Sequence, residues 1–253
     1  MTNKLKYFIG NWKMFGDFGD FKIVNRINRF SFTSRKSFKK KKIVLCVPST
    51  LIHYFNQKLL SKFISLGVQN CHHQQTYGPY TGAVSASMLK KAGANYIILG
   101  HSENRTEGET NSLIKKKIIS ALNQKLNVIF CIGETSSEKK NNKTLLVLRN
   151  QIRASLEKKL NIKKIIIAYE PVWSIGSNKL PKLSDLKNII KFIKNDISKI
   201  FKTKKNLKVL YGGSVNNKNI RLFSTISEID GFLIGGASQS SKKFIDIVKN
   251  YYK

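Results

Sequence analysis

Side chains that could do proton-transfer chemistry stand where apolar runs of this sequence end. Glu170 directly follows the run Ile165–Tyr169, His101 follows Tyr96–Gly100, and Asn11 and Lys13 close the first run. A carboxylate can remove a proton, and an imidazole, an ammonium group and an amide can donate hydrogen bonds to a developing anion. The set suits a proton transfer through an anionic intermediate. Singly, each residue has an ordinary structural explanation as an ion-pair partner, a cap or a core histidine.

Two glycine-rich turns follow the last two apolar runs, and they suggest a phosphate site. The first, "YGGS", contains Ser214, and the second, "IGGAS", contains Gly235 and Gly236. Backbone N–H groups at such turns bind phosphate in barrel enzymes, most often after strands seven and eight. Either turn alone is a weak indication, but both together predict a phosphorylated substrate. No pair of chemistry-bearing residues has metal-ligand spacing, so we expect neither a metal nor another cofactor.

Eight short apolar runs, separated by segments of helical periodicity, position these residues. The predicted strands are Tyr7–Trp12, Ile43–Val47, Gly67–Asn70, Tyr96–Gly100, Val128–Ile132, Ile165–Glu170, Lys208–Tyr211 and Gly231–Ile234. Continuous apolar strands are typical of a parallel sheet covered on both faces. Eightfold alternation in 253 residues predicts an α/β fold, the closed (β/α)₈ TIM barrel, as a single domain over residues 1–253. Barrel chemistry sits at the carboxyl ends of the strands, where the residues above are found.

The formal net charge of +32 raises the question of a nucleic-acid partner. Lysine runs are spread between apolar segments and lack interleaved aromatic residues, so we expect no specific nucleic acid and only a higher local concentration of small anions. The apolar runs are too short to cross a membrane, and the first residues show no signal peptide. The three cysteines form no CxxC pair. We therefore expect a cytoplasmic protein with reduced thiols and no membrane partner.

The sequence resembles the triosephosphate isomerase family over essentially its whole length. The resemblance lies in "FIGNWKM", "CVPST", "GVQNCH", "YTGAVSASMLKKAGANYIILGHSE", "VIFCIGET", "IIAYEPVWSIG", "LYGGSVN" and "DGFLIGGAS". It implies interconversion of dihydroxyacetone phosphate and glyceraldehyde 3-phosphate through an enediolate. Glu170 matches the family's base, and His101, Lys13 and Asn11 match its oxyanion donors. The N-terminus of a helix after His101 would disfavour its cation.

Further roles follow from the same resemblance. Glu103 would support the histidine and the lysine, whereas Cys131 and Glu134 are expected only to shape the wall beside the base. The segment "PVWSIGSNK" resembles a mobile lid whose Gly176 would place a backbone N–H on the phosphate with Ser214, Gly235 and Gly236. The segment "HHQQTYGPYTGAVSA" (residues 72–86) resembles a loop that enters the neighbouring subunit, with Thr81 near its tip. A homodimer is expected.

The sequence departs from the family pattern at three places. The lid's second hinge usually reads Gly-Thr-Gly-Lys, but Asn178 replaces the second glycine here. Asparagine adopts left-handed backbone more readily than other non-glycine residues, so we expect altered lid motion. Ala83 and Asn104 replace the two residues that form an ion pair between subunits in the family. Because such pairs contribute little, we expect the dimer to persist with at most a small loss of affinity. The segment "NRTEGET" is one residue shorter than usual, which would shift the helix after His101 slightly.

Two alternatives remain at this stage. A basic binding protein that has lost catalysis is possible, but the complete set of four chemistry-bearing residues argues against it. A Schiff-base aldolase would need a desolvated lysine inside the barrel, whereas the sixth run presents Glu170.

Overall fold

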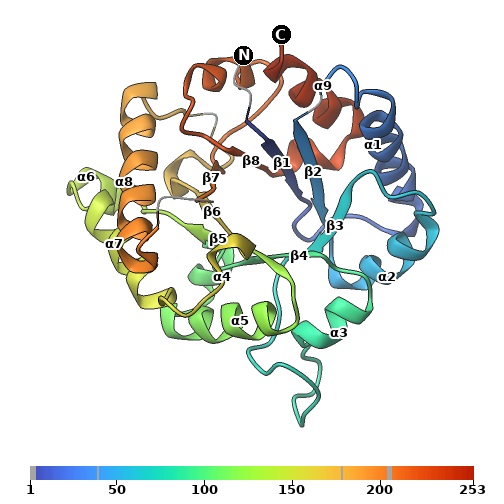
Figure 1. Ribbon diagram of the computed structural model, residues 1–253, viewed down its shortest axis with the longest axis horizontal. Coiled ribbons are helices and arrows are strands. Elements are labelled where there is room, and N and C mark those ends of the chain that lie inside the picture. Colours follow the sequence, from blue (N-terminus) through green and yellow to red (C-terminus); the bar gives the residue numbers. More distant parts are fainter. Residues whose placement is uncertain (1–3, 39, 178, 204–206) are drawn as a thin grey trace.

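A computed structural model describes residues 4–38, 40–177, 179–203 and 207–253, and it contains a closed barrel of eight parallel strands (Figure 1). Neighbouring strands pair in chain order, and β1 pairs with β8 to close the ring. The strands are β1 (Lys6–Asn11), β2 (Lys41–Cys46), β3 (Ser65–Val68), β4 (Tyr96–Leu99), β5 (Asn127–Ile132), β6 (Ile165–Tyr169), β7 (Val209–Tyr211) and β8 (Gly231–Ile234). The predicted TIM barrel is confirmed.

Helices surround the strands in Figure 1. The α-helices are α1 (Phe21–Thr33), α2 (Ser49–Lys58), α3 (Ala86–Lys91), α4 (Ser102–Thr106), α5 (Asn111–Asn123), α6 (Ser136–Lys140), α7 (Thr144–Ser155), α8 (Leu183–Phe201) and α9 (Ser241–Tyr251). Five 3₁₀ helices accompany them in the described ranges: η1 (Phe18–Asp20), η2 (Ile162–Lys164), η3 (Val172–Ser174), η4 (Ile220–Thr225) and η5 (Gly236–Gln239).

The strands are mostly apolar because both of their faces are buried. Outward-facing residues pack with the helices in one large cluster, and alternate residues form a second cluster inside the barrel. The interior cluster consists of Tyr7, Ile9, Val44, Cys46, Tyr96, Ile98, Ile129, Cys131, Ile166, Ala168, Leu210 and Leu233. Strand side chains alternate with a period of two, so this pattern fixes which residues point inward at the mouth.

Two of the predicted catalytic residues continue this inward alternation. Ile166 and Ala168 lie in the interior cluster, and Glu170 follows two residues later, directly after β6. Asn11 ends β1 and follows the interior residue Ile9 in the same way. The apolar interior therefore ends in an amide and a carboxylate at the carboxyl end of the barrel.

Strand boundaries differ from the predicted ones by up to two residues. β8 is as predicted, but β1 begins at Lys6, whose side chain is 1% exposed and donates to the carbonyl of Ile229. A lysine at a strand start is not recognisable as buried from the sequence. β3 runs from Ser65 to Val68, two residues earlier than predicted, because Ser65 pairs with Val44 of β2.

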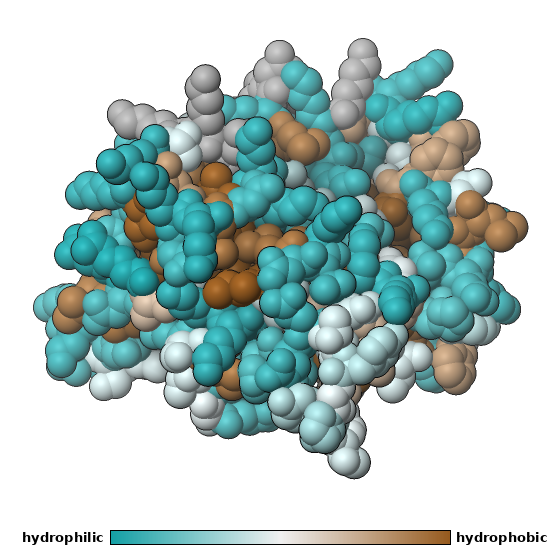
Figure 2. All heavy atoms as spheres, turned by 60° about the horizontal axis from the view of Figure 1, so that its bottom comes forward, coloured by the Kyte–Doolittle hydropathy of each residue, from teal (hydrophilic) through white to brown (hydrophobic). Residues whose placement is uncertain are grey.

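The surface reflects the high charge of the chain. Figure 2 shows hydrophilic residues covering most of the face that it displays, with hydrophobic side chains gathered in smaller areas. None of the helices in the described ranges combines the length and the apolar character needed to cross a bilayer.

Candidate active site

A cavity of about 260 Å³ opens at the carboxyl ends of the strands and brings together most of the predicted site residues. Eight of them line it: Asn11, Lys13, His101, Glu170, Gly176, Ser214, Gly235 and Gly236. They come from segments that follow β1, β4, β6, β7 and β8. Glu103 lines a neighbouring cavity of about 360 Å³ that also contacts Asn11, Lys13 and His101. Thr81 is exposed and lines neither cavity.

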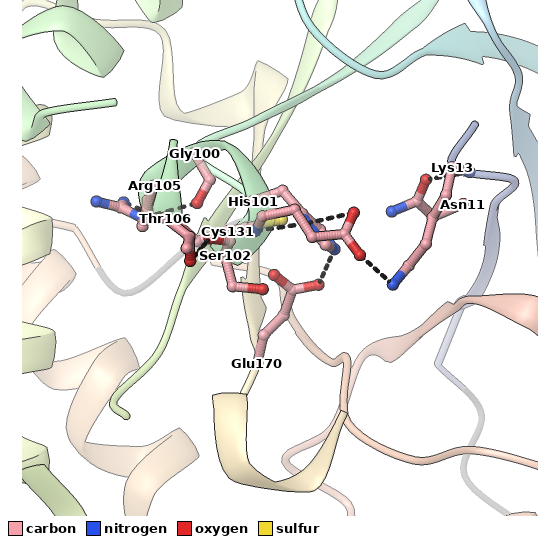
Figure 3. Close-up of polar contacts among 10 residues, drawn as sticks. Asn11, Lys13, Gly100, His101, Ser102, Arg105, Thr106, Cys131 and Glu170 are labelled. Carbon is pink, nitrogen blue, oxygen red and sulfur yellow. Dashed lines mark hydrogen bonds and ion pairs between the residues drawn. The ribbon is translucent and has the colours of Figure 1, made fainter. Parts of the chain in front are cut away.

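Glu170 and His101 face each other across the mouth (Figure 3). Glu170 Oε1 lies 3.3 Å from His101 Nε2, and both side chains are almost fully buried. His101 precedes α4, and its Nδ1 accepts a hydrogen bond from the backbone N–H of Glu103 at 3.2 Å. A neutral imidazole with Nδ1 as acceptor carries its proton on Nε2. The side of the ring that faces the cavity is then the donor side.

Burial sets the basicity of Glu170, which is 3% exposed. Burial raises the pKa of its carboxyl group, and His101, a hydrogen bond from the Cys131 thiol and the Lys13 ammonium oppose that rise. Burial also raises the pKa of Cys131 well above its usual range, so this thiol serves as a neutral donor to the carboxylate. No hydrogen-bond partner of Glu170 Oε2 lies within the described residues. That oxygen is buried, so its hydrogen-bonding capacity is unused within this part of the chain.

Two glycines make room for Glu170. A Cβ atom on Gly133 would lie 1.8 Å from the Glu170 carbonyl oxygen, and one on Gly212 would lie 2.8 Å from Glu170 Cγ. Both distances are shorter than van der Waals contact, so a larger residue at position 133 would displace the Glu170 backbone and one at position 212 would displace its side chain. Gly212 is the first glycine of the "YGGS" turn. This turn therefore seats the carboxylate in addition to lining the cavity.

The β1 end supplies two further polar groups. Asn11 Oδ1 accepts the backbone N–H of Lys13 at 3.0 Å, which leaves the amide nitrogen of Asn11 as the donor that can face the cavity. Lys13 has φ of +57°, an uncommon backbone for a residue with a side chain. Its ammonium group lies 2.5 Å from Glu103 Oε1. Lys13 is thus oriented by Asn11 at its backbone and by Glu103 at its side-chain end.

The segment after Glu170, predicted to be a lid, is anchored at both of its ends. Trp173 donates from its indole N–H to Glu134 Oε1 at 2.8 Å, and Lys139 Nζ lies 3.2 Å from the centroid of the Trp173 ring. Ser174 Oγ donates to the carbonyl of Lys179 at 2.6 Å. Between these anchors Gly176 is exposed and has φ of +67°. Asn178, the unusual hinge residue, lies outside the described residues.

Three residues that matter to this arrangement were missed or given no chemistry from the sequence. Arg105, which was not singled out, donates to the carbonyls of Gly100 and Cys131 at 2.8 and 3.1 Å and thereby links the ends of β4 and β5. Cys131 was expected only to shape the wall, but its thiol contacts the base. Ser174 contacts Tyr211 Oη at 3.2 Å and accepts the N–H of Ser214 at 3.4 Å. Periodicity gives no signal for such contacts between separate loops.

Loop 72–86 projects from the barrel between β3 and α3 (Figure 1). Its base is closed by a hydrogen bond from the His72 N–H to the Val84 carbonyl at 2.8 Å, and its tip, including Thr81, is exposed. Ala83 lies in this loop, and Asn104 lines the neighbouring cavity that holds Glu103.

Within the described ranges, no cluster of three or more His, Cys, Asp or Glu side chains has the geometry of a metal site.

Comparison with known proteins agrees with the geometry of the site. Residues 6–251 match the protein-family model described as Triosephosphate isomerase. The triosephosphate isomerase of Dictyoglomus thermophilum is 40% identical over 250 residues, which cover 97% of this chain and 99% of that protein. The triosephosphate isomerase of Bartonella bacilliformis is 37% identical, and the match covers 100% of both chains. The crystal structure of triosephosphate isomerase from Bartonella henselae superposes with a TM-score of 0.88 and 36% identity, over 98% of this chain and 99% of that one. The chain belongs to the triosephosphate isomerase family of enzymes.

Proposed function

We propose that the mouth of the barrel interconverts dihydroxyacetone phosphate and D-glyceraldehyde 3-phosphate. The observation that carries this proposal is the meeting of a buried carboxylate, three polarising donors and two glycine-rich turns in one cavity of about 260 Å³. Moving a carbonyl group to the adjacent carbon requires one base that takes a proton from carbon and returns it to the neighbouring carbon. Glu170 is that base.

Negative charge on the enediolate oxygens must be stabilised by donors that are already aimed at them. His101 Nε2–H, the Lys13 ammonium group and the Asn11 amide supply these donors. Glu170 Oε1 lies 3.3 Å from His101 Nε2. A substrate that replaces this contact receives the base on carbon and the imidazole donor on oxygen. Glu103 is a supporting residue because it orients Lys13 from 2.5 Å.

The phosphate group binds at the other side of the cavity, to backbone N–H groups of Gly176, Ser214, Gly235 and Gly236. The Ser214 N–H donates to Ser174 Oγ at 3.4 Å, at the long end of hydrogen-bond distances. Closing the lid over the phosphate would exchange this contact for a charge-assisted one. Closure also excludes water, which strengthens the stabilisation of the enediolate.

A homodimer is the second part of the proposal. The exposed tip of loop 72–86, with Thr81, enters the cavity of about 360 Å³ beside Lys13 and Glu103 on the neighbouring subunit. Ala83 and Asn104 remove both partners of one ion pair together, so no charge is left unpaired, and the expected loss is only about 0–1 kcal/mol. Sedimentation at micromolar concentration tests this, and a monomer there would contradict it.

Some expectations from the sequence stay predictions. They are a single domain over residues 1–253, a cytoplasmic location, and function without a cofactor, a specific nucleic acid or a membrane partner.

A coupled assay for glyceraldehyde 3-phosphate isomerisation tests the assigned roles. Glu170→Asp withdraws the base by one methylene group, and His101→Gln replaces the imidazole donor with an amide. We expect kcat to fall at least about 100-fold in both variants, since misplacing a reacting group by about 1 Å has an effect of that size. Full turnover in either variant would refute the assigned role. Trapping of a substrate adduct by borohydride would instead favour an aldolase that uses a lysine Schiff base.

A further inference from the structure

A further cavity, of about 590 Å³, lies at the opposite end of the barrel from the active site. Its lining comes from the start of β1 and the residues before it, from the segments that precede β7 and β8, and from the second half of α8. The lining residues are Lys4, Leu5, Tyr7, Lys194, Asn195, Ser198, Leu207, Lys208 and Asp230. In a parallel barrel, the segments that precede the strands meet at the end away from the catalytic mouth. The two cavities have no lining residue in common.

The carboxylate of this cavity is already paired within the wall. Asp230 Oδ2 accepts the backbone N–H of Val209 at 2.9 Å and the ammonium group of Lys194 at 2.6 Å. Lys194 also donates to the carbonyl of Glu228 at 2.7 Å. Asp230 is therefore a structural group that joins β7, β8 and α8. Within the described residues, its ion pair is with Lys194 and not with Lys4 or Lys208.

Positive charge exceeds negative charge at this cavity. Lys4 is exposed, and Lys208 is half-buried with its Nζ 5.4 Å from the centroid of the Tyr7 ring. Three lysines line the cavity against one aspartate, which gives a local net charge of +2. The C-terminal end of α8 opposes this with about half an elementary charge, which is too little to reverse it. The cavity thus favours an anion with at least two charges.

A further lysine lies behind the wall. Lys6 is 1% exposed and donates to the carbonyl of Ile229. Burial lowers the pKa of Lys6, Asp230 raises it, and the ammonium groups of Lys194 and Lys4 lower it again. An anion bound beside these lysines would reduce their mutual repulsion.

The size and the remaining lining indicate the class of anion. Ligand sites for small organic molecules range from about 300 to 1,000 Å³, and this cavity lies within that range. Leu5 and Leu207 give it an apolar part, and Asn195 and Ser198 add polar side chains. We propose that this cavity binds a small organic polyphosphate of the nucleoside di- or triphosphate class, with its phosphates on Lys4 and Lys208 and its organic part against the two leucines. The site is separate from the isomerase reaction proposed above.

Calorimetric titration of the full chain with ADP, pyrophosphate and orthophosphate at low salt tests the proposal. We expect saturable binding of ADP that is tighter than that of pyrophosphate, and the weakest binding for orthophosphate. Lys208→Gln and, separately, Lys4→Gln should each weaken ADP binding about tenfold, as expected for the loss of one hydrogen bond to a charged group. Isomerase activity should be unchanged in Lys208→Gln.

Two control variants separate this site from other anion binding. Lys163→Gln removes the same charge from an exposed lysine that precedes β6 and does not line the cavity, so ADP binding should be unchanged. Lys13→Gln alters the catalytic cavity and should also leave ADP binding unchanged. An equal loss in Lys163→Gln would indicate diffuse charge attraction, and a loss in Lys13→Gln would indicate binding at the active site. Either result overturns the proposal.

Two further outcomes also overturn it: no saturable binding of ADP up to about 10 mM, or pyrophosphate binding as tightly as ADP. If Lys208→Gln does not fold, as judged by circular dichroism, the exposed position of Lys4 keeps the test decisive.

Discussion

Gly212→Ala is the perturbation that most directly tests whether the position of Glu170 governs catalysis. A Cβ atom at residue 212 would lie 2.8 Å from Glu170 Cγ and 3.3 Å from Oε1. Carbon atoms normally approach to about 3.5–4.0 Å, so Cγ must move by about 1 Å. The φ angle of Gly212 is not positive, so alanine introduces no backbone strain there. The added methyl group therefore acts on the carboxylate.

We expect kcat to fall about 100-fold in Gly212→Ala, since a misplacement of about 1 Å has that effect on a reacting group. KM should change little, because the phosphate-binding residues stay in place. Overpacking should lower the free energy of unfolding by about 1–3 kcal/mol. The coupled isomerase assay gives kcat and KM, and urea unfolding gives the change in stability.

Gly67→Ala is a matched control for this variant. Its Cβ would lie 2.8 Å from Cys46 Sγ and 2.9 Å from the carbonyl oxygen of Tyr96, so crowding is similar but does not involve Glu170. We expect a loss of stability with a normal kcat for the folded protein. A folded Gly212→Ala variant with a wild-type kcat would refute the reasoning, because the carboxylate could then move without effect.

Three further predictions concern the lid and the base. Lys139→Met removes the cation 3.2 Å from the Trp173 ring, an interaction of about 0.5–1 kcal/mol. The lid should then close more readily, and KM should fall about two- to fivefold in the steady-state assay. Lys140→Met is the control and should leave KM unchanged. Cys131→Ala removes a hydrogen bond that lowers the pKa of Glu170. Because only the ionised base is active, the acid limb of the pH profile of kcat/KM should move to higher pH. Cys131→Ser keeps a donor and should return the acid limb to its wild-type position. Glu170→Gln should abolish turnover. It should also raise the free energy of unfolding at neutral pH by about 1 kcal/mol, because a buried carboxylate with a raised pKa destabilises the fold when ionised. That gain should shrink as the pH falls and Glu170 becomes protonated, and a destabilised variant in denaturant melts would contradict this explanation.

Much of the barrel was predictable because its strands are apolar on both faces. The run Ile165–Tyr169 has no polar residue, and β6 occupies that run. Prediction was less accurate where polar residues are buried or paired by distant partners. Lys6 pairs with Lys41 of β2, and its ammonium group can be buried because the carbonyl of Ile229, 223 residues away, accepts a hydrogen bond from it. Local patterns contain no information on a partner at that distance.

The site could be predicted in composition but not in its supporting contacts. Asn11 and Glu170 follow from their positions at the ends of apolar runs, and the resemblance supplied their roles. The contact of Cys131 with Glu170, the link made by Arg105 and the space left by Gly212 depend on neighbouring strands and loops. No sequence motif indicates the cavity at the other end of the barrel, because its lining residues come from three separate segments and one helix.

The barrel interior connects the stability of the fold to the chemistry of its mouth. Ile166 and Ala168 are interior residues of β6 and lie directly below Glu170 along the strand. Their burial stabilises the barrel, and it also removes water from the lower side of the carboxylate, which raises the pKa of Glu170. A raised pKa makes the carboxylate a stronger base when it is ionised. The residues that close the barrel therefore set the strength of its base, and a polar substitution below Glu170 would weaken both.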